Sequence, residues 1–383
     1  MGPAVTKTIS LLLLIVIGYL FQKKIKSKDN LEGIKTLILS LALPATIFIA
    51  LLQIDFKSDL IIIPVLSIGF NLFMYLLMDK IPFRSLFNIP LNQYRTLIML
   101  IPSLAPGLSC FPFIIEYSGQ GPLAMAALAD VGNKIFVLII SYTIAMQWYY
   151  DVNRDITPNG KNKTKDLLGS LVNEPVNLVM IAALVMLALG LNYSHFPQAI
   201  SLSIDRLSLL MTPLILLFIG LSMRLTWDQV KTIFSFLFFR SGIAFLLSAI
   251  VLVILPVTDI PTMLLIIVFP QSACSFWPYA HMAAVAKLEN KSTPGKSKTF
   301  DLDFAMNVLA CSMPFSVVLI MIIYASGDFF AGTTQLFTSA FAFMISAVLI
   351  VLVSSRSWSL EKNNNGNITT EAKPGENPAS SHA

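Results

Sequence analysis

The stretch PSLAPGLSCFP, residues 102–112, places three prolines and a glycine inside an otherwise apolar segment. A proline within a helix removes a backbone donor and clashes with the preceding turn, at a cost of roughly 3 kcal/mol. In lipid, no water is present to donate hydrogen bonds to the freed carbonyl groups. Such a break is therefore expected only where protein buries the irregular backbone or where a solute reaches it.

The composition indicates a polytopic membrane protein. Of the 383 residues, 56% are hydrophobic and only 12% are charged, whereas a soluble domain carries about 25% charged residues. Nearly uncharged runs such as TISLLLLIVIGYLF and AFLLSAIVLVILPV are typical of the roughly 20-residue segments that span hydrocarbon. No small-x-small cleavage site follows the first run, so we expect it to be retained as a span.

Hydropathy predicts an all-α fold with eleven membrane spans. We expect these spans at about residues 7–22, 36–53, 59–78, 96–117, 122–148, 175–193, 206–223, 233–257, 262–285, 303–325 and 334–354.

The lysines and arginines predict the orientation of the chain in the membrane. Basic and nearly uncharged connections alternate, and the basic ones hold 22 of the 26 lysines and arginines, with Arg240 counted before the eighth span. Lys7, Lys57 and Arg206 fall on the other side, and Lys134 falls within a span. The positive-inside rule then predicts an outside N-terminus and a cytoplasmic C-terminus. The net charge of +5 is thus a topology signal, and a nucleic-acid partner is not expected.

Two halves of the chain resemble each other. PATIFIAL (44–51) is similar to PLILLFIGL (213–221), SCFPF (109–113) matches SFWPY (275–279), and the fifth and tenth spans each carry an Asp and an Asn. Because each half has five spans, the second repeat is expected to be inverted. We predict a first repeat at 1–149, a cytoplasmic linker at 150–173, a second repeat at 174–326, an additional span at 327–354 and a disordered cytoplasmic tail at 355–383.

Proline clusters interrupt the fourth and ninth spans, at corresponding positions of the two halves. Paired interruptions of this kind are a sequence indicator of a transporter binding site near the bilayer midplane. At 1.5 Å per helical residue, Pro106 lies about 15 Å deep. A single proline more often marks a simple kink, but two mirrored clusters favour a solute site.

These segments resemble the auxin-efflux-carrier family of permeases, in the superfamily that includes the bile-acid:sodium symporters. The resemblance runs from about residue 8 to 325 and includes VIGYLFQKKIKSKDNLEGIKTLILSLALPATIF, SCFPFIIEYSGQGPLAMAALADVGN and FPQSACSFWPYAHMAA. It implies two inverted five-helix repeats, crossed helices 4 and 9 around the site, elevator-like alternating access and export of organic anions. The chain departs from the family at PSLAPG, where an Asn-x-Gly entry is usual, at AHMAAVAKLENK, where acidic residues are frequent, and in its eleventh span.

The candidate site residues lie in and around the two interruptions. Asp130 and Lys134, spaced i and i+4 in the fifth span, are functional candidates because charged groups at this depth are costly. A mutually neutralising structural pair is the alternative. The predicted substrate-binding residues are Pro106, Ser109, Cys110, Pro112, Asn133, Lys134, Pro270, Gln271, Ser275 and Pro278, and the predicted ion- or proton-coupling residues are Asp130 and Asn307.

The sequence therefore predicts a secondary transporter that moves a small organic anion by alternating access, with efflux favoured. A sodium-coupled symporter of the bile-acid type and a transporter-like receptor are the alternatives. We expect no enzymatic activity, cofactor or metal, because no phosphate-binding loop, metal-spaced His/Cys cluster or Ser/His/Asp arrangement occurs. The expected location is a bacterial inner or plasma membrane, and a homodimer is left open.

Overall fold

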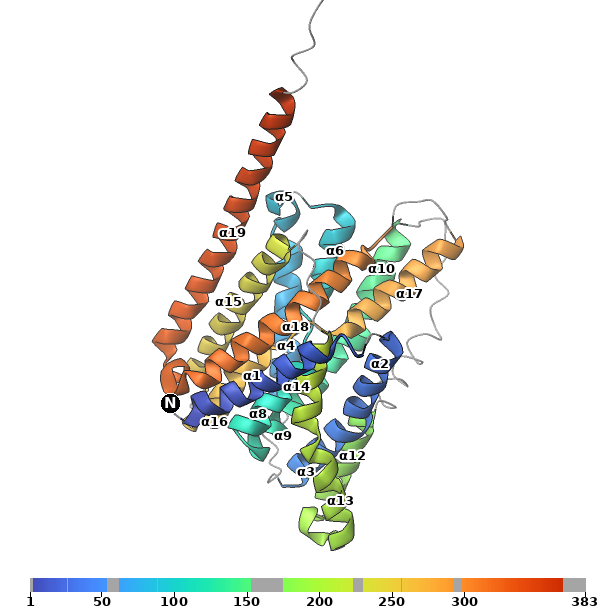
Figure 1. The fold of residues 1–383 in the computed structure, drawn as a ribbon, viewed down its shortest axis with the longest axis vertical. Coiled ribbons are helices and arrows are strands. Elements are labelled where there is room, and N and C mark those ends of the chain that lie inside the picture. Colours follow the sequence, from blue (N-terminus) through green and yellow to red (C-terminus); the bar gives the residue numbers. More distant parts are fainter. Residues whose placement is uncertain are drawn as a thin grey trace, which may run out of the picture.

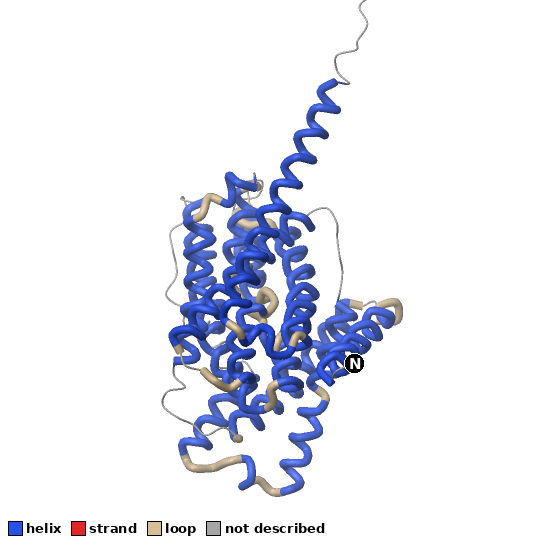
Figure 2. The backbone as a smooth tube through the Cα atoms, turned by 90° about the vertical axis from the view of Figure 1, so that its left-hand side faces the viewer, coloured by secondary structure: helices blue, strands red, loops and turns tan. Residues whose placement is uncertain are grey.

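A computed structural model describes residues 3–25, 27–53, 62–87, 89–152, 175–222, 230–255, 257–292 and 298–367. Every element in these ranges is helical, and none of the described residues lies in a strand (Figure 2). Most of the predicted linker (150–173) and the end of the predicted tail (368–383) lie outside the described residues.

The first half contains ten α-helices and two π-helical turns among its described residues. They are α1 (Pro3–Phe21), α2 (Lys28–Leu37), η1 (Ile38–Ala42), α3 (Leu43–Leu52), α4 (Ile62–Lys80), α5 (Phe83–Phe87), α6 (Leu91–Leu100), α7 (Pro106–Ser109), α8 (Phe111–Tyr117), α9 (Gln120–Ile135), η3 (Phe136–Ile140) and α10 (Ser141–Val152).

The second half continues with α12 and ends with the long helix α19 (Figure 1). Its elements are α12 (Pro175–Ala188), η4 (Tyr193–His195), α13 (Gln198–Leu209), α14 (Met211–Ser222), α15 (Val230–Ile254), α16 (Ile260–Val268), η5 (Phe269–Gln271), α17 (Phe276–Ser292), α18 (Leu302–Ala325), η6 (Gly327–Ala331) and α19 (Thr333–Asn367).

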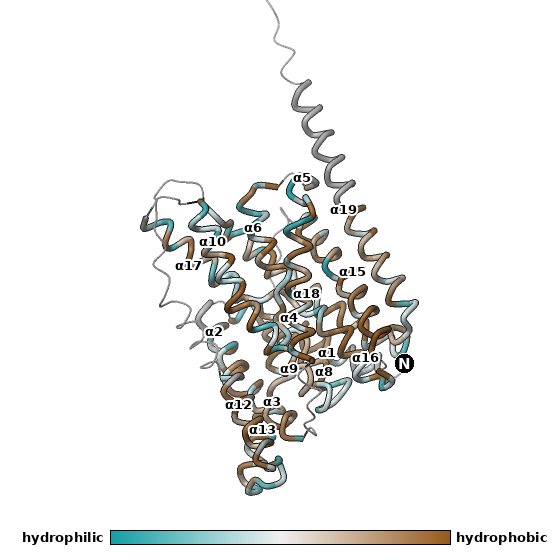
Figure 3. Tube along the Cα trace, turned by 180° about the vertical axis from the view of Figure 1, so that it is seen from behind, coloured by the Kyte–Doolittle hydropathy of each residue, from teal (hydrophilic) through white to brown (hydrophobic). Residues whose placement is uncertain are grey.

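Eight described helices are long and apolar enough to cross a membrane, whereas the sequence predicts eleven spans. The apolar part of α1 is only Ile9–Phe21. The predicted fourth span is divided among α6, α7 and α8, and the described part of the sixth is the short helix α12. The difference thus arises from interrupted or short helices. Hydrophobic residues predominate along α3, α12 and α16 (Figure 3).

The predicted boundaries differ from the helices at the end of the first half and at the end of the second. Helix α10 continues to Val152, beyond the predicted start of the linker at 150. Helix α19 continues to Asn367, so its helical residues extend beyond the predicted end of the eleventh span at 354 into the predicted tail. Along its earlier part, α19 packs against α15 (Figure 1).

Glycines allow several helices to approach closely. A Cβ atom added at Gly18 of α1 would overlap the carbonyl oxygen of Leu217 in α14, and one at Gly220 of α14 would overlap the carbonyl oxygen of Ile15. Gly132 of α9 lies in the same way against the carbonyl oxygen of Pro64 in α4. Small residues let membrane helices pack backbone to backbone, and the contact at Gly132 fixes α9 next to the candidate site.

Candidate functional site

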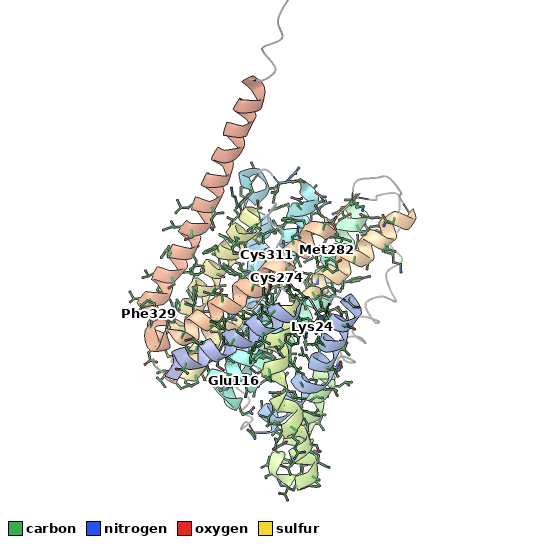
Figure 4. All side chains as sticks on the ribbon, in the orientation of Figure 1. Lys24, Glu116, Cys274, Met282, Cys311 and Phe329 are labelled. Atoms are coloured by element: carbon green, nitrogen blue, oxygen red, sulfur yellow. The ribbon has the colours of Figure 1, made fainter. Side chains whose placement is uncertain are left out.

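Two membrane-spanning segments are broken, and the breaks contact each other. The first break, residues 101–105, separates α6 from α7, and the second break, residues 272–275, separates η5 from α17. The backbone N–H of Ala105 donates to the carbonyl oxygen of Ala273 at 2.8 Å. The two breaks together, here termed the crossing, form one hydrogen-bonded unit. Cys274, within the second break, lies in the interior of the bundle (Figure 4).

The predicted prolines begin helical segments beside the breaks. Pro106 is the first residue of α7, Pro112 the second residue of α8 and Pro270 the second residue of η5. Pro278 is the third residue of α17. A proline in the first turn is well tolerated, because the N–H that it lacks would have no partner within the helix. Pro106, Pro112 and Pro278 therefore lie in the first turns of helices that follow an irregular residue, whereas Pro270 lies in η5, directly after α16 and before the second break.

The same serine geometry closes the helix before each break. The hydroxyl groups of Ser103 and Ser272 donate to the carbonyl oxygens of Leu100 and Phe269, each at 2.6 Å. The backbone N–H of each serine donates to the same carbonyl, each at 3.1 Å. The serines thus satisfy the carbonyl of Leu100, the last residue of α6, and that of Phe269, the first residue of η5. Ser272 then takes an extended conformation, with φ −56° and ψ 151°.

Serine hydroxyl groups also join the two breaks. The backbone N–H of Ala273 donates to Ser109 Oγ at 2.9 Å, and that of Ser275 donates to Ser103 Oγ at 2.9 Å. Buried amide groups need such partners in a region without water. Of the predicted residues, Ser109 thus contributes its side chain to the crossing, whereas Ser275 contributes its backbone to this contact.

Asn133 on α9 holds the first break through its side-chain amide. Its Oδ1 accepts from the N–H of Leu104 at 3.1 Å, and its Nδ2 donates to the carbonyl oxygen of the same residue at 2.9 Å. Nδ2 also donates to Asp130 Oδ1 at 2.9 Å, and Oδ1 accepts from Asn71 Nδ2 of α4 at 2.9 Å. One buried side chain therefore joins the first break, the charged residues of α9 and α4.

The two predicted charged residues of α9 form a buried ion pair. Lys134 Nζ lies 3.4 Å from Asp130 Oδ2, and each residue is 6% exposed. The pair is neutral overall, which lowers its cost in an apolar interior. Through Asn133, the carboxylate of Asp130 is linked to the backbone of Leu104.

Arg240 is a residue of the crossing that the sequence analysis counted among the cytoplasmic charges. The structure corrects this: Arg240 lies in the middle of α15 and is 0% exposed. Its Nε donates to the carbonyl oxygen of Ile101 at 2.8 Å, and its Nη2 donates to those of Ser103 at 3.3 Å and Ser272 at 2.6 Å. A charge seven positions inside a predicted span was the signal that could have identified it.

The remaining predicted residues differ in their relation to the crossing. Cys110 is buried, and its Sγ lies 3.7 Å from the carbonyl oxygen of Val268. Gln271 Nε2 donates to the carbonyl oxygen of Ser241 at 3.1 Å. Asn307 is partly exposed in α18. It is Ser312 of that helix whose Oγ accepts from the backbone N–H of Cys274, at 3.3 Å.

An apolar cavity of about 420 Å³ lies beside the second break. Residues of α4, α9, α15 and α16 line it, and Phe269 and Pro270 form its wall next to the break. Ala129, which precedes Asp130 in α9, also lines the cavity. In the described part of the chain, no group of three or more His, Cys, Asp or Glu side chains could hold a metal ion.

Comparison with known proteins finds similarity to a transporter. The chain is 21% identical, over 242 residues, to the protein named uncharacterized transporter MJ1031 of Methanocaldococcus jannaschii. The aligned region covers 59% of this chain and 73% of that protein. No protein-family model matches the chain, so membership in the auxin-efflux-carrier family stays a prediction.

Proposed function

We propose that this protein is a secondary transporter that moves a small organic anion, such as a carboxylate, across the membrane by alternating access, with export as the favoured direction. The observation that carries the proposal is the hydrogen bond between the two breaks, from Ala105 to Ala273. Irregular backbone at membrane depth occurs where protein buries it or where it lines a cavity, and paired interruptions at corresponding positions of two repeats are typical of transporter sites. The similarity to a protein named as a transporter and the eight apolar helices support the same function.

Packing between the halves supports the proposed inverted repeats. Helix α1 packs against α14, and α12 packs against α3, so the first span of each half contacts the second span of the other. Within the halves, α4 packs against α9 and α15 packs against α18, as the third and fifth spans of each repeat would. A reciprocal arrangement of this kind fits two inverted repeats that move against each other in alternating access.

The ion pair on α9 favours an anion transporter over a sodium-coupled symporter. A sodium site needs free oxygen ligands, usually carboxylates and carbonyls. The carboxylate of Asp130 already accepts a hydrogen bond from Asn133 and forms an ion pair with Lys134. The ammonium group of Lys134 therefore lies where a cation would bind. We therefore propose Lys134 as a substrate-facing or cation-replacing charge, and Asp130 as its proton-coupling partner.

A counterflow assay tests this function directly. Purified protein in liposomes preloaded with unlabelled mono- or dicarboxylates should accumulate the matching radiolabelled compound, and an imposed sodium gradient should leave the rate unchanged. Stimulation by sodium would instead support the symporter alternative. Binding of a carboxylate without passage of tracer across the vesicle membrane would contradict transport and support a receptor.

A further inference from the structure

Arg240 is the buried charge that joins the two breaks. Its Nη2 atom donates to Ser103 and Ser272, which are the two residues that close the helices before the breaks in the same geometry. Its Nε atom holds Ile101, at the start of the first break. A single planar guanidinium thus contacts backbone oxygens on both sides of the crossing, which the point charge of a lysine cannot reproduce.

The charge of Arg240 has no carboxylate partner among the described residues. The ion pair nearest along the network, Asp130 with Lys134, is neutral in itself, and the groups that Arg240 contacts are carbonyl oxygens. Its Nη1 atom is buried and has no hydrogen-bond partner in the described part of the chain. The crossing therefore carries one net positive charge and an unused donor, in an interior where charge acts strongly.

We propose that Arg240 is the positioning residue of the crossing, which locks the two breaks to each other and supplies the unpaired positive charge that selects anions. The locking follows from the hydrogen bonds alone, whereas the selection of anions rests on the proposed function. In this arrangement α15 carries the crossing as one unit, so the first and second breaks move together when the site changes its access.

Hydrogen exchange of the full-length protein in lipid nanodiscs tests the locking. Arg240→Gln should raise the exchange rates of peptides covering 101–105 and 272–275 together, by about tenfold, because both sets of carbonyl contacts are lost. Arg240→Lys should give a smaller rise in both peptides, and it remains informative where Arg240→Gln does not fold. Unchanged exchange, or a rise in only one break, would overturn the locking.

Ser235→Ala is the matched control for these variants. Ser235 is also buried in α15, but it donates to the carbonyl oxygen of Ala347 in α19 at 2.8 Å, away from the crossing. Its removal should leave exchange in both breaks at the wild-type rate. An equal rise in this variant would show that any buried change in α15 loosens the breaks, and would overturn the specific role of Arg240.

Uptake of radiolabelled malonate into proteoliposomes tests the charge. Arg240→Gln should raise KM about tenfold, equivalent to about 1.4 kcal/mol. Arg240→Lys should keep KM close to wild type but lower kcat, because the charge remains while the locking geometry is lost. A KM equally high in both variants would overturn the role of the charge. If the wild-type protein takes up no carboxylate, the proposed function and the anion selection fail together, while hydrogen exchange still decides the locking.

Discussion

The two breaks share their local backbone geometry but differ in what anchors them. Each contains a serine, Ser103 or Ser272, whose hydroxyl and N–H groups both donate to the carbonyl oxygen three residues earlier. The first break is then held by Asn133, an amide linked to the ion pair on α9. The second is held by hydroxyl groups, those of Ser109 and Ser312. The two breaks are therefore similar in their backbone geometry, but only the first is hydrogen-bonded to the ion pair of Asp130 and Lys134.

The second half has no buried equivalent of Asp130 and Asn133 at the positions that correspond to them in the sequence. The sequence pairs Asp130 and Asn133 with Asp303 and Asn307, but Asp303 is exposed and Asn307 is partly exposed. The charge that contacts the second break is Arg240, on α15, and it contacts the first break as well. The two breaks thus have similar backbone geometry, but only the first is joined, through Asn133, to the ion pair of Asp130 and Lys134. The predictions below test this asymmetry.

The largest effect is expected for Lys134→Ala. Removing one member of a buried ion pair leaves an uncompensated charge and costs about 3–5 kcal/mol, so we expect loss of carboxylate uptake and a lower thermal unfolding midpoint in detergent. Lys80→Ala is the control, because Lys80 pairs with Asp79 at 3.5 Å on an exposed surface and exposed pairs contribute about 0–1 kcal/mol. Normal uptake by Lys134→Ala would remove this residue from the site.

Asn133→Ala is expected to have the next largest effect. It leaves the buried N–H and carbonyl of Leu104 unpaired, at about 1–3 kcal/mol for each group, and it disconnects the first break from Asp130. The unfolding midpoint and the uptake rate should both fall. Asn307→Ala, at the corresponding position of the second half, should change either quantity much less. Equal losses in the two variants would contradict the asymmetry between the breaks.

A smaller effect is expected for Ser109→Ala. The Ala273 N–H loses its acceptor at 2.9 Å, and an unsatisfied buried amide costs about 1–3 kcal/mol. Ser312→Ala should cost less, because its bond to the Cys274 N–H is longer, at 3.3 Å. Unfolding midpoints of the two variants provide the test. A greater loss for Ser312→Ala would show that α18, and not the first break, supports the second.

The smallest effect is expected for Pro278→Ala. Alanine at the third residue of α17 restores an N–H near the helix start, where no intrahelical acceptor exists, and changes stability by about 1 kcal/mol or less. The second break should persist, because Ser272 and the bonds to the first break hold it. Hydrogen exchange of residues 272–275 measures this. Strong new protection would show that Pro278 itself maintains the break.

Several features of the site could be predicted from the sequence. Pro106, Pro270 and Pro278 indicated the breaks, because proline is conspicuous in an apolar run, and the spacing of Asp130 and Lys134 placed them on one helix face. Arg240 could have been identified as a charge inside the predicted span 233–257, but it was counted with the cytoplasmic connection before that span. The hydrogen bonds of Ser103 and Ser272 to the preceding turn, and those of Asn133 to Leu104, were not predictable. Serine and asparagine occur in many membrane helices without such roles.

The sequence by itself determined the helical membrane class and the approximate positions of the breaks along the chain, because apolar length and proline act locally along the chain. Only the tertiary structure decided which groups satisfy the freed backbone. The partners of Ala105, Leu104 and Ser272 lie on other segments of the chain, 29 to 168 positions away, and hydrogen bonds depend on distances of about 3 Å that sequence patterns do not fix. For that reason the carbonyl partners of Arg240 in the two breaks became known only from the packing of the helices.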